Sequence, residues 1–284
     1  MRARIHGSIA AAAAGTAIAA LTVAGLGGTA EASQARTTAV GLSNGGRMLV
    51  AFDTLAPKRF QRIGTVTGLQ GDLRLVGIDY RVQDRNLYGV GDAGGVYVLS
   101  TRNGAANKVS QLSVPLQGGS FGVDFNPAAN RLRVISDTGQ NLRHNLDDGA
   151  TAGTTLVDGT LSYPPATGAA TGVTGAAYTN NDLDPNTATT LYDLDTNLDQ
   201  IAVQSPANAG SLAPTGKLGV DAGTDAGFDI VSTVKRGRTT SVQGFATLPV
   251  GGVSVLYRIN LITGEATARG TLPVTVTDLA IPLR

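Results

Sequence analysis

Five short stretches decide the fold: GIDY at residues 77–80, GVDF at 122–125, GAAY at 175–178, GFDI at 227–230 and a weaker copy, DLAI, at 278–281. Successive copies lie 45 to 53 residues apart, a period typical of the four-stranded blades of a β-propeller. Between the copies, runs rich in β-branched and aromatic residues alternate with Asn-Gly and Asp-Gly turns, as tight hairpins require. The repeat therefore predicts an all-β chain of four-stranded antiparallel units.

The first unit begins one strand late. Residues 38–42, 48–52 and 62–66 have the pattern of the second, third and fourth strands of a blade. The missing first strand is found at the other end of the chain, at residues 277–283. Pairing of the two termini in one blade closes the ring and removes the exposed sheet edges. We therefore predict a five-bladed β-propeller closed by its C-terminal strand, with six blades as the alternative.

The N-terminus has the pattern of a secretory signal. Arg2 and Arg4 precede an uncharged stretch at residues 7–30, and residues 30–32 read Ala-Glu-Ala, a suitable cleavage site. A transmembrane anchor is the alternative, but a stretch dominated by alanine and glycine favours membrane insertion only weakly. The sequence predicts a signal peptide at 1–32, a single propeller domain at 33–284, and no stable membrane span after cleavage. The expected location is extracellular or in the cell envelope.

The composition excludes several classes of site. The chain has no cysteine and only two histidines, His6 and His144, which excludes thiolate and multi-histidine metal centres. A net charge of +1 gives no reason to expect a nucleic-acid partner. No G-x-S-x-G elbow accompanies His144, so we expect it to be an ordinary surface residue at a strand end. No cofactor is predicted.

Several motifs resemble one known family. They are the repeated GIDY-like copies, SDTGQNLR at residues 136–143, AAYTNN at 176–181 and GFDIV at 227–231. These motifs resemble the bacterial secreted family catalogued as domain of unknown function 4394, over roughly residues 38–283. The resemblance implies an exported, propeller-like domain. The family has no established activity, so the resemblance assigns no catalytic residue.

Asp137, Gln140, Asn141 and Arg143 form the densest polar cluster in the sequence. Asp137 opens a predicted hairpin turn, which by itself accounts for that residue. The other three would either bond neighbouring blades or present a bidentate arginine and two amides to a carboxylate or a sugar. These four residues are the predicted ligand site.

An acidic loop offers a weaker candidate for a metal site. Asp182, Asp184 and Asn186 have the alternating spacing of a calcium loop, and Asp193 falls at position 12. Thr187 stands where such a loop needs glycine. A solvated hairpin loop explains the same residues, so no metal is predicted to be needed for folding.

Asp79, Asp124 and Asp229 occupy the third position of the repeated motif, where Ala177 and Ala280 stand in the other two copies. On the innermost strands, they would ring the axis, where a propeller glycosidase would place its acids. Alternation of side chains instead turns them toward the next blade, to accept hydrogen bonds from backbone N–H groups. The sequence favours the structural role, and on that basis an Asp124→Asn substitution is expected to destabilise the fold by roughly 1–3 kcal/mol.

The favoured function is a non-catalytic binding or interaction module that presents loops to an unknown extracellular ligand or protein partner, as a monomer. A carboxylate-dependent, glycosidase-like hydrolase with acids near the axis is the alternative, and a purely structural envelope protein is a weaker one. The absence of tryptophan disfavours sugar recognition, which leans on aromatic platforms. The fold alone does not choose among these functions.

Overall fold

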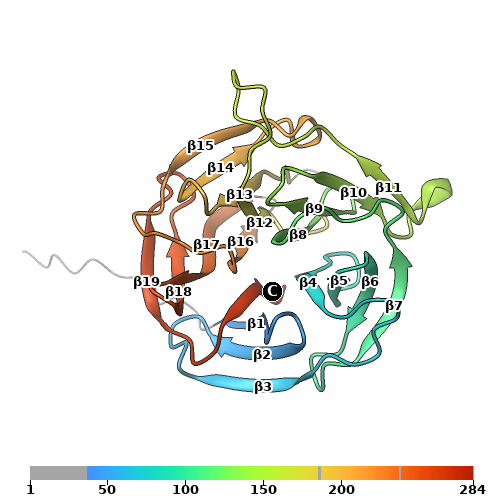
Figure 1. Ribbon diagram of the computed structural model, residues 1–284, viewed down its shortest axis with the longest axis horizontal. Helices are drawn as coiled ribbons and strands as arrows, with labels where there is room; N and C mark the ends of the chain where they lie inside the picture. The colour runs from blue at the N-terminus through green and yellow to red at the C-terminus, as the bar shows by residue number, and fades with distance from the viewer. Residues whose placement is uncertain (1–36, 185–186, 237, 284) are drawn as a thin grey trace, which may run out of the picture. The chain divides into compact units, whose positions relative to one another are not determined.

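The computed structural model describes residues 37–184, 187–236 and 238–283. Within these ranges, five four-stranded antiparallel sheets form a ring, which confirms the predicted five-bladed propeller (Figure 1). The helices of the described residues are two short 3₁₀ turns, Gly149–Thr151 and Ala207–Ala209. No helix in this part of the chain is long and apolar enough to cross a membrane. The signal peptide predicted at 1–32 lies outside the described residues.

Each blade is a meander that runs from the axis to the rim. From the inner to the outer strand, blade 1 contains β20 (Val276–Ala280), β1 (Thr38–Ser43), β2 (Met48–Asp53) and β3 (Phe60–Thr65). Blade 2 contains β4 (Leu75–Tyr80), β5 (Leu87–Gly91), β6 (Gly95–Leu99) and β7 (Ala106–Gln111). Blade 3 contains β8 (Phe121–Asn126), β9 (Arg131–Ser136), β10 (Asn141–Asn145) and β11 (Thr154–Val157).

The two remaining blades follow the same order. Blade 4 contains β12 (Val173–Tyr178), β13 (Leu191–Asp195), β14 (Gln200–Gln204) and β15 (Leu212–Lys217). Blade 5 contains β16 (Gly227–Lys235), β17 (Arg238–Val250), β18 (Val253–Ile259) and β19 (Ala266–Thr271). The two strands β16 and β17 are longer than any others in the ring.

The ring closes as the sequence predicts. The C-terminal strand β20 pairs antiparallel with β1, with Val40 opposite Ala280 and Leu42 opposite Asp278. The N-terminal blade therefore takes its innermost strand from the end of the chain. This pairing leaves no gap between the first and last blades.

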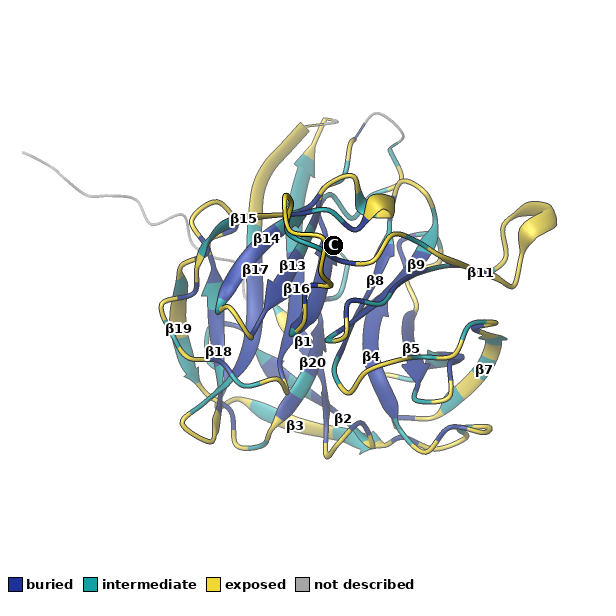
Figure 2. Ribbon diagram, turned by 45° about the horizontal axis from the view of Figure 1, so that its top comes forward, coloured by how far each residue is buried: buried dark blue, intermediate teal, exposed yellow. Residues whose placement is uncertain are grey.

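The core lies between the blades and around the axis. Every residue of β4 and of β12 is buried, whereas the outer strand β7 alternates between half-buried and exposed positions, and Figure 2 shows the same gradient from axis to rim. Apolar side chains of adjacent blades pack together in five clusters. Burial on both faces accounts for the near-continuous apolar character of the inner strands.

The glycines of the repeated motif let the inner strands approach one another closely. A Cβ atom on Gly122 would lie 2.5 Å from the backbone nitrogen of Ala176, on the next inner strand. A Cβ atom on Gly227 would lie 2.5 Å from the Cα atom of Asp278. Since backbone atoms cannot move aside as a flexible side chain does, the first position of the motif requires glycine wherever the strands pack this closely.

We expect Gly122→Ala to destabilise the propeller by about 1–3 kcal/mol or more, because the added methyl group must displace backbone in the tightest part of the core. Gly168→Ala is the matched control: a Cβ atom there meets no atom within 4 Å. The control should change stability by less than about 0.5 kcal/mol. Urea unfolding followed by circular dichroism measures both, and equal stability of the two variants would contradict the packing explanation.

Candidate functional site

The three aspartates of the repeated motif link neighbouring inner strands. Each carboxylate accepts a hydrogen bond from a backbone N–H group of the next inner strand around the ring. The three bonds run from Phe125 N to Asp79 Oδ2 (2.8 Å), from Tyr178 N to Asp124 Oδ1 (3.2 Å) and from Ile281 N to Asp229 Oδ2 (2.5 Å). The aspartates thus join blade 2 to 3, blade 3 to 4 and blade 5 to 1.

A fourth aspartate, which the sequence did not single out, joins blade 1 to blade 2. Asp278 occupies the position of the motif glycine in the fifth copy, and its Oδ2 accepts a hydrogen bond from Ile78 N at 2.7 Å. The carboxylate lies beside Gly77, where an added Cβ atom would lie 3.1 Å from the same oxygen and 2.3 Å from Cγ2 of Val123. In the sequence this residue could have been found as the aspartate that replaces glycine at the first position of the fifth copy, DLAI.

Asp79, Asp124 and Asp229 also converge on one another. One oxygen of each lies within 4.8 Å of the other two, and the residues are only 2 to 6% exposed. A side chain that turns toward the next blade therefore also turns toward the axis. The sequence analysis treats aspartates that ring the axis and aspartates that face the next blade as alternatives. In this ring the same three side chains do both.

Burial in this cluster favours the neutral form of the acids. Burial raises the pKa of Asp79 well above its usual value, and the charge of Asp229 raises it further. Burial likewise raises the pKa of Asp124, with the charge of Asp79 adding to the effect. Burial raises the pKa of Asp229 to about 7, although two backbone hydrogen bonds act in the opposite direction. Three carboxylates this close must share protons or a cation at neutral pH.

The cluster is the set of described residues whose geometry suits a cation. Carboxylate oxygens are the ligands that calcium prefers, but calcium needs six to eight oxygens. The three aspartates together offer six oxygens, and four of these already accept a backbone hydrogen bond. Protons neutralise the three carboxylates without the six to eight oxygen ligands that calcium needs.

A large cavity lies at one mouth of the axis. It encloses about 620 Å³ and is lined by turns and strand ends from blades 1, 2, 3 and 5. Its hydroxyl and amide groups come from Ser43, Asn44, Ser120, Thr224, Thr275 and Thr277. Its apolar lining comes from Met48, Leu75, Val76, Phe121, Ala226 and Val274, and its charged lining from Arg74 and Asp225.

The cavity does not reach the axial acids. Val76 and Phe121 line it, and they directly precede the motif glycines Gly77 and Gly122. Asp79 lies three residues farther along its strand than Val76, which corresponds to roughly 10 Å of extended chain. The acids are therefore below the lining of the cavity, inside the ring of inner strands.

Two of the predicted ligand residues hold a wall of this cavity. Asp137 Oδ1 accepts a hydrogen bond from Gly119 N at 2.9 Å, and Gln140 Oε1 accepts one from Gln117 N at 2.9 Å. Gly119 belongs to the cavity lining, whereas Asp137 and Gln140 are not among the described residues that line it. Their role in the structure is to fix the loop before β8.

The other two predicted ligand residues lie away from this loop, between blades 3 and 4. Asn141 is buried, and its Oδ1 accepts a hydrogen bond from Arg133 Nη1 at 2.8 Å. Arg143 binds both oxygens of Asp158, each at 3.1 Å. Arg133 also binds Asp158, at 2.6 Å. The structure therefore separates the predicted cluster into two pairs, each engaged in intramolecular hydrogen bonds.

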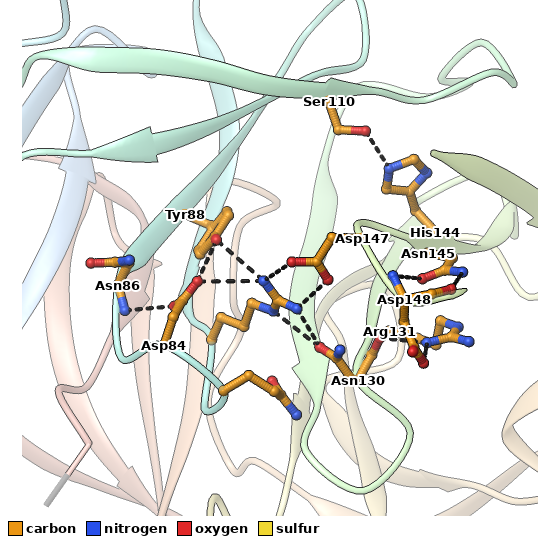
Figure 3. A network of polar contacts seen from close by, with 12 residues as sticks. Asp84, Asn86, Tyr88, Ser110, Asn130, Arg131, His144, Asn145, Asp147 and Asp148 are labelled. Atoms are coloured by element: carbon orange, nitrogen blue, oxygen red, sulfur yellow. Dashed lines mark hydrogen bonds and ion pairs between the residues drawn. The ribbon is translucent and has the colours of Figure 1, made fainter. Parts of the chain in front are cut away.

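The expectation that His144 lies at the surface is wrong. The imidazole is fully buried between blades 2 and 3. Its Nε2 lies 2.9 Å from Ser110 Oγ (Figure 3), and its Nδ1 lies 3.0 Å from Thr155 Oγ1. Burial lowers the pKa of His144, so the ring is neutral at pH 7. A catalytic serine–histidine pair needs a carboxylate to orient the ring, and here a threonine hydroxyl takes that place. The contact is a bridge between blades.

A second bridge between the same blades is built on Arg81. This buried guanidinium binds both oxygens of Asp147, at 2.9 and 2.5 Å, and also donates to Asn130 Oδ1 (Figure 3). Asp84 accepts from Arg81 at 3.4 Å and from the hydroxyl of Tyr88 at 2.6 Å. The hydrogen bonds with Arg81 lower the pKa of Asp147 below its usual value. All three nitrogens of the Arg81 guanidinium therefore bind acceptors within the protein.

The acidic loop and Asp193 occupy different surroundings. Asp182 Oδ1 accepts a hydrogen bond from Asp184 N at 2.8 Å, as in a tight turn, and Asn186 lies outside the described residues. Asp193 belongs to β13, is completely buried, and has no hydrogen-bond partner on either oxygen among the described residues. Burial raises the pKa of Asp193 well above its usual value, while the charge of Arg133 opposes this.

Comparison with known proteins places the chain in a family. The family model described as domain of unknown function (DUF4394) matches residues 48–280. The chain belongs to this family. The match confirms the resemblance found in the repeats, and no curated protein matches the chain.

Two solved structures are similar to this chain at low sequence identity. A chain of the nidogen/laminin complex is 11% identical, with a TM-score of 0.47, over 87% of this chain and 98% of that chain. A structural genomics protein of unknown function from Bacteroides thetaiotaomicron VPI-5482 is 15% identical, with a TM-score of 0.45, over 87% of this chain and 65% of that chain. These likenesses say nothing about function.

We expect the axial acids to make the protein less stable as the pH rises from about 4 to 8. A carboxyl group whose pKa is raised by folding stabilises the native state fully below its unfolded pKa of about 4, and this contribution is lost as the pH rises through the folded pKa. For Asp229 that value is about 7. Asparagine at position 124 keeps an acceptor for Tyr178 N–H and carries no charge. The free energy of unfolding of Asp124→Asn should therefore exceed that of the parent by about 1–3 kcal/mol at pH 8, and the two should differ little at pH 5.

This expectation reverses the destabilisation inferred from the sequence, because the sequence did not reveal the neighbouring carboxylates. Urea unfolding in the presence of EDTA at both pH values measures the difference, with the exposed Asp221→Asn as the control. Equal destabilisation of Asp124→Asn at both pH values would contradict it. A fall of about ten degrees in the melting temperature of the parent on EDTA treatment, reversed by calcium, would show that a cation stabilises the native state.

Proposed function

We propose that the protein is an exported, non-catalytic binding module that holds a small ligand in the cavity at the mouth of its axis. The observation that carries this proposal is the cavity itself, about 620 Å³ lined by residues of four blades. Pockets of roughly 300–1,000 Å³ are usual for small-molecule ligands. Residues on a rigid ring offer a preformed site whose chemistry varies without changing the fold.

The lining indicates an uncharged polar ligand with one apolar face. Hydroxyl groups of Ser120, Thr224 and Thr275 provide hydrogen-bond partners, and Phe121 provides an apolar surface. Of the two charged residues, Arg74 lies 3.8 Å from Asp92, which partly offsets its charge. A ligand with hydroxyl or amide groups and little net charge fits this pattern.

The geometry does not favour the alternative of a glycosidase. Glycosidases place two carboxyl groups roughly 5–10 Å apart on either side of a substrate. The axial oxygens lie within 4.8 Å of one another, below the cavity lining, and accept backbone hydrogen bonds. We therefore assign the axial acids to the closure of the ring.

The proposal of export rests on the N-terminal sequence. The basic residues Arg2 and Arg4, the uncharged stretch at 7–30 and the Ala-Glu-Ala at 30–32 follow the order of a secretory signal. A chain without cysteine folds after export without oxidation. An extracellular or envelope location follows for the propeller.

The test is a binding screen with a parallel assay for turnover. The propeller is titrated by calorimetry with neutral mono- and disaccharides and short uncharged peptides, and incubated with chromogenic glycosides and esters. We expect binding without turnover. Thr275→Trp, which narrows the cavity, should weaken that binding by at least about tenfold, a loss of 1.4 kcal/mol.

Thr101→Trp is the control, because Thr101 is exposed on the β6–β7 turn and does not line the cavity. It should leave affinity unchanged. Equal affinity of the Thr275 variant and the parent would place the ligand elsewhere. Turnover of a glycoside that disappears in Asp124→Asn would favour the hydrolase instead.

A further inference from the structure

Blade 5 carries a hairpin arm that the other blades lack. Strand β16 has nine residues, whereas the other inner strands have five or six. Strand β17 has thirteen, whereas the second strands of the other blades have five or six. The outer halves of these two strands, residues 231–235 and 238–243, pair with each other and form the arm. Figure 2 shows it at the top of the view, with exposed and half-buried residues. Nothing in the closure of the ring requires this extension.

One edge of the arm has no strand beside it. Strand β18 pairs with β17 only from Gly244 to Val250, and it ends at Ile259, opposite Gly244. After Ile259 the chain turns away at Asn260, whose backbone N–H donates a hydrogen bond to the carbonyl oxygen of Glu265 at 3.0 Å. In the described residues, no strand pairs with residues 238–243 on that side. The alternate N–H and C=O groups of this edge are a template for another strand.

A groove runs along this free edge. It encloses about 560 Å³ and is bounded by Thr239 and Val242 of the arm, by Tyr192 of blade 4, and by the turn between β18 and β19. A strand placed in the groove would continue the line of β18 beyond Ile259. Ile262, 80% exposed, and Val242, 38% exposed, offer apolar contacts to its side chains.

The charges around the groove select its occupant. Lys235, Arg236 and Arg238 are exposed at the tip of the arm, and Arg258 lines the groove, against a single acid, Glu265. A second copy of this chain, paired antiparallel through the same edge, would bring no acidic residue of its arm opposite this charge, because residues 231–235 and 238–243 contain neither aspartate nor glutamate. An acidic strand meets opposite charge along the same edge.

We propose that the groove binds an extended, acidic segment of a partner protein, which adds to the free edge of β17 as an extra strand. Main-chain hydrogen bonds to residues 238–243 hold the segment, as in other cases of strand addition. Apolar side chains of the segment contact Val242 and Ile262, and acidic ones face the basic tip. The site is separate from the axial cavity, so this interaction does not depend on the function proposed for that cavity.

The probe is a fluorescein-labelled eight-residue peptide of alternating glutamate and valine, titrated with the propeller and followed by fluorescence anisotropy. The acidic peptide should bind, and the same peptide with lysine in place of glutamate should not. Replacing Lys235, Arg236 and Arg238 together by serine should weaken binding by at least about tenfold. Replacing three other exposed basic residues, Lys58, Arg62 and Arg102, changes the net charge equally and should leave binding intact.

Two further comparisons separate strand addition from simple charge attraction. Alternate N–H groups of a strand point to opposite edges, so N-methylation of the valines blocks one edge of the peptide and N-methylation of the glutamates blocks the other. One of these two peptides should lose binding and the other should retain it. Ile262→Ser should weaken binding, and Leu73→Ser, at a residue 75% exposed outside the groove, should not.

Several results would overturn the proposal. They are the absence of binding at millimolar protein, equal binding of the acidic and basic peptides, and equal binding of both N-methylated peptides. Concentration-dependent dimerisation that the Lys235, Arg236 and Arg238 substitutions leave intact would instead assign the edge to a second copy of the chain.

Discussion

The close packing of five inner strands around one axis is the constraint on which the rest of the structure depends. The strands approach so closely that a Cβ atom on Gly122 would lie 2.5 Å from the backbone of the next strand. At this separation a carboxylate on one strand reaches the N–H group of its neighbour, and four aspartates do so. The same closeness brings three carboxylates together out of water, which raises their pKa values. The hydrogen bonds that close the ring and the raised pKa values of the axial aspartates therefore have one cause.

The architecture was predictable because short local sequence motifs, which repeat along the chain, determine it. Asn-Gly and Asp-Gly turns separate the strands, and the five copies of the GIDY-like motif, three of which read Gly-x-Asp, mark the inner strands of the blades. The late start of the first unit and the extra copy at 278–281 predicted the pairing of β1 with β20. Alternation along a strand also indicated that the motif aspartates face the next blade. It did not show that Asp79, Asp124 and Asp229 meet, since that depends on how narrow the ring is.

The surroundings of single residues were less predictable, because they depend on contacts between blades. His144 lies next to an acidic turn in the sequence, yet it is buried against Ser110, 34 residues earlier. Asn141 and Arg143 lie one and three residues after Gln140 but face a different blade interface. The axial cavity is lined mainly by serine, threonine and apolar residues from turns and strand ends far apart in the sequence, which form no motif in the chain. The free edge of β17 follows from where β18 ends, and the ends of strands are what a sequence predicts least precisely.

Removal of residues 277–284 is the measurement that tests the closure of the ring most directly. The deletion takes away most of β20, including Leu279 (1% exposed), and the following Ile281 (3% exposed). With them go the partner of β1 and the N–H group bound by Asp229. Burial of such side chains contributes about 1.5–3 kcal/mol each, against a total stability of about 5–15 kcal/mol for a domain. We predict that the truncated protein loses its cooperative unfolding transition in urea. A truncated protein that unfolds cooperatively and melts within about three degrees of the full chain would contradict the account, since about 1 kcal/mol corresponds to only a few degrees in a domain of this size.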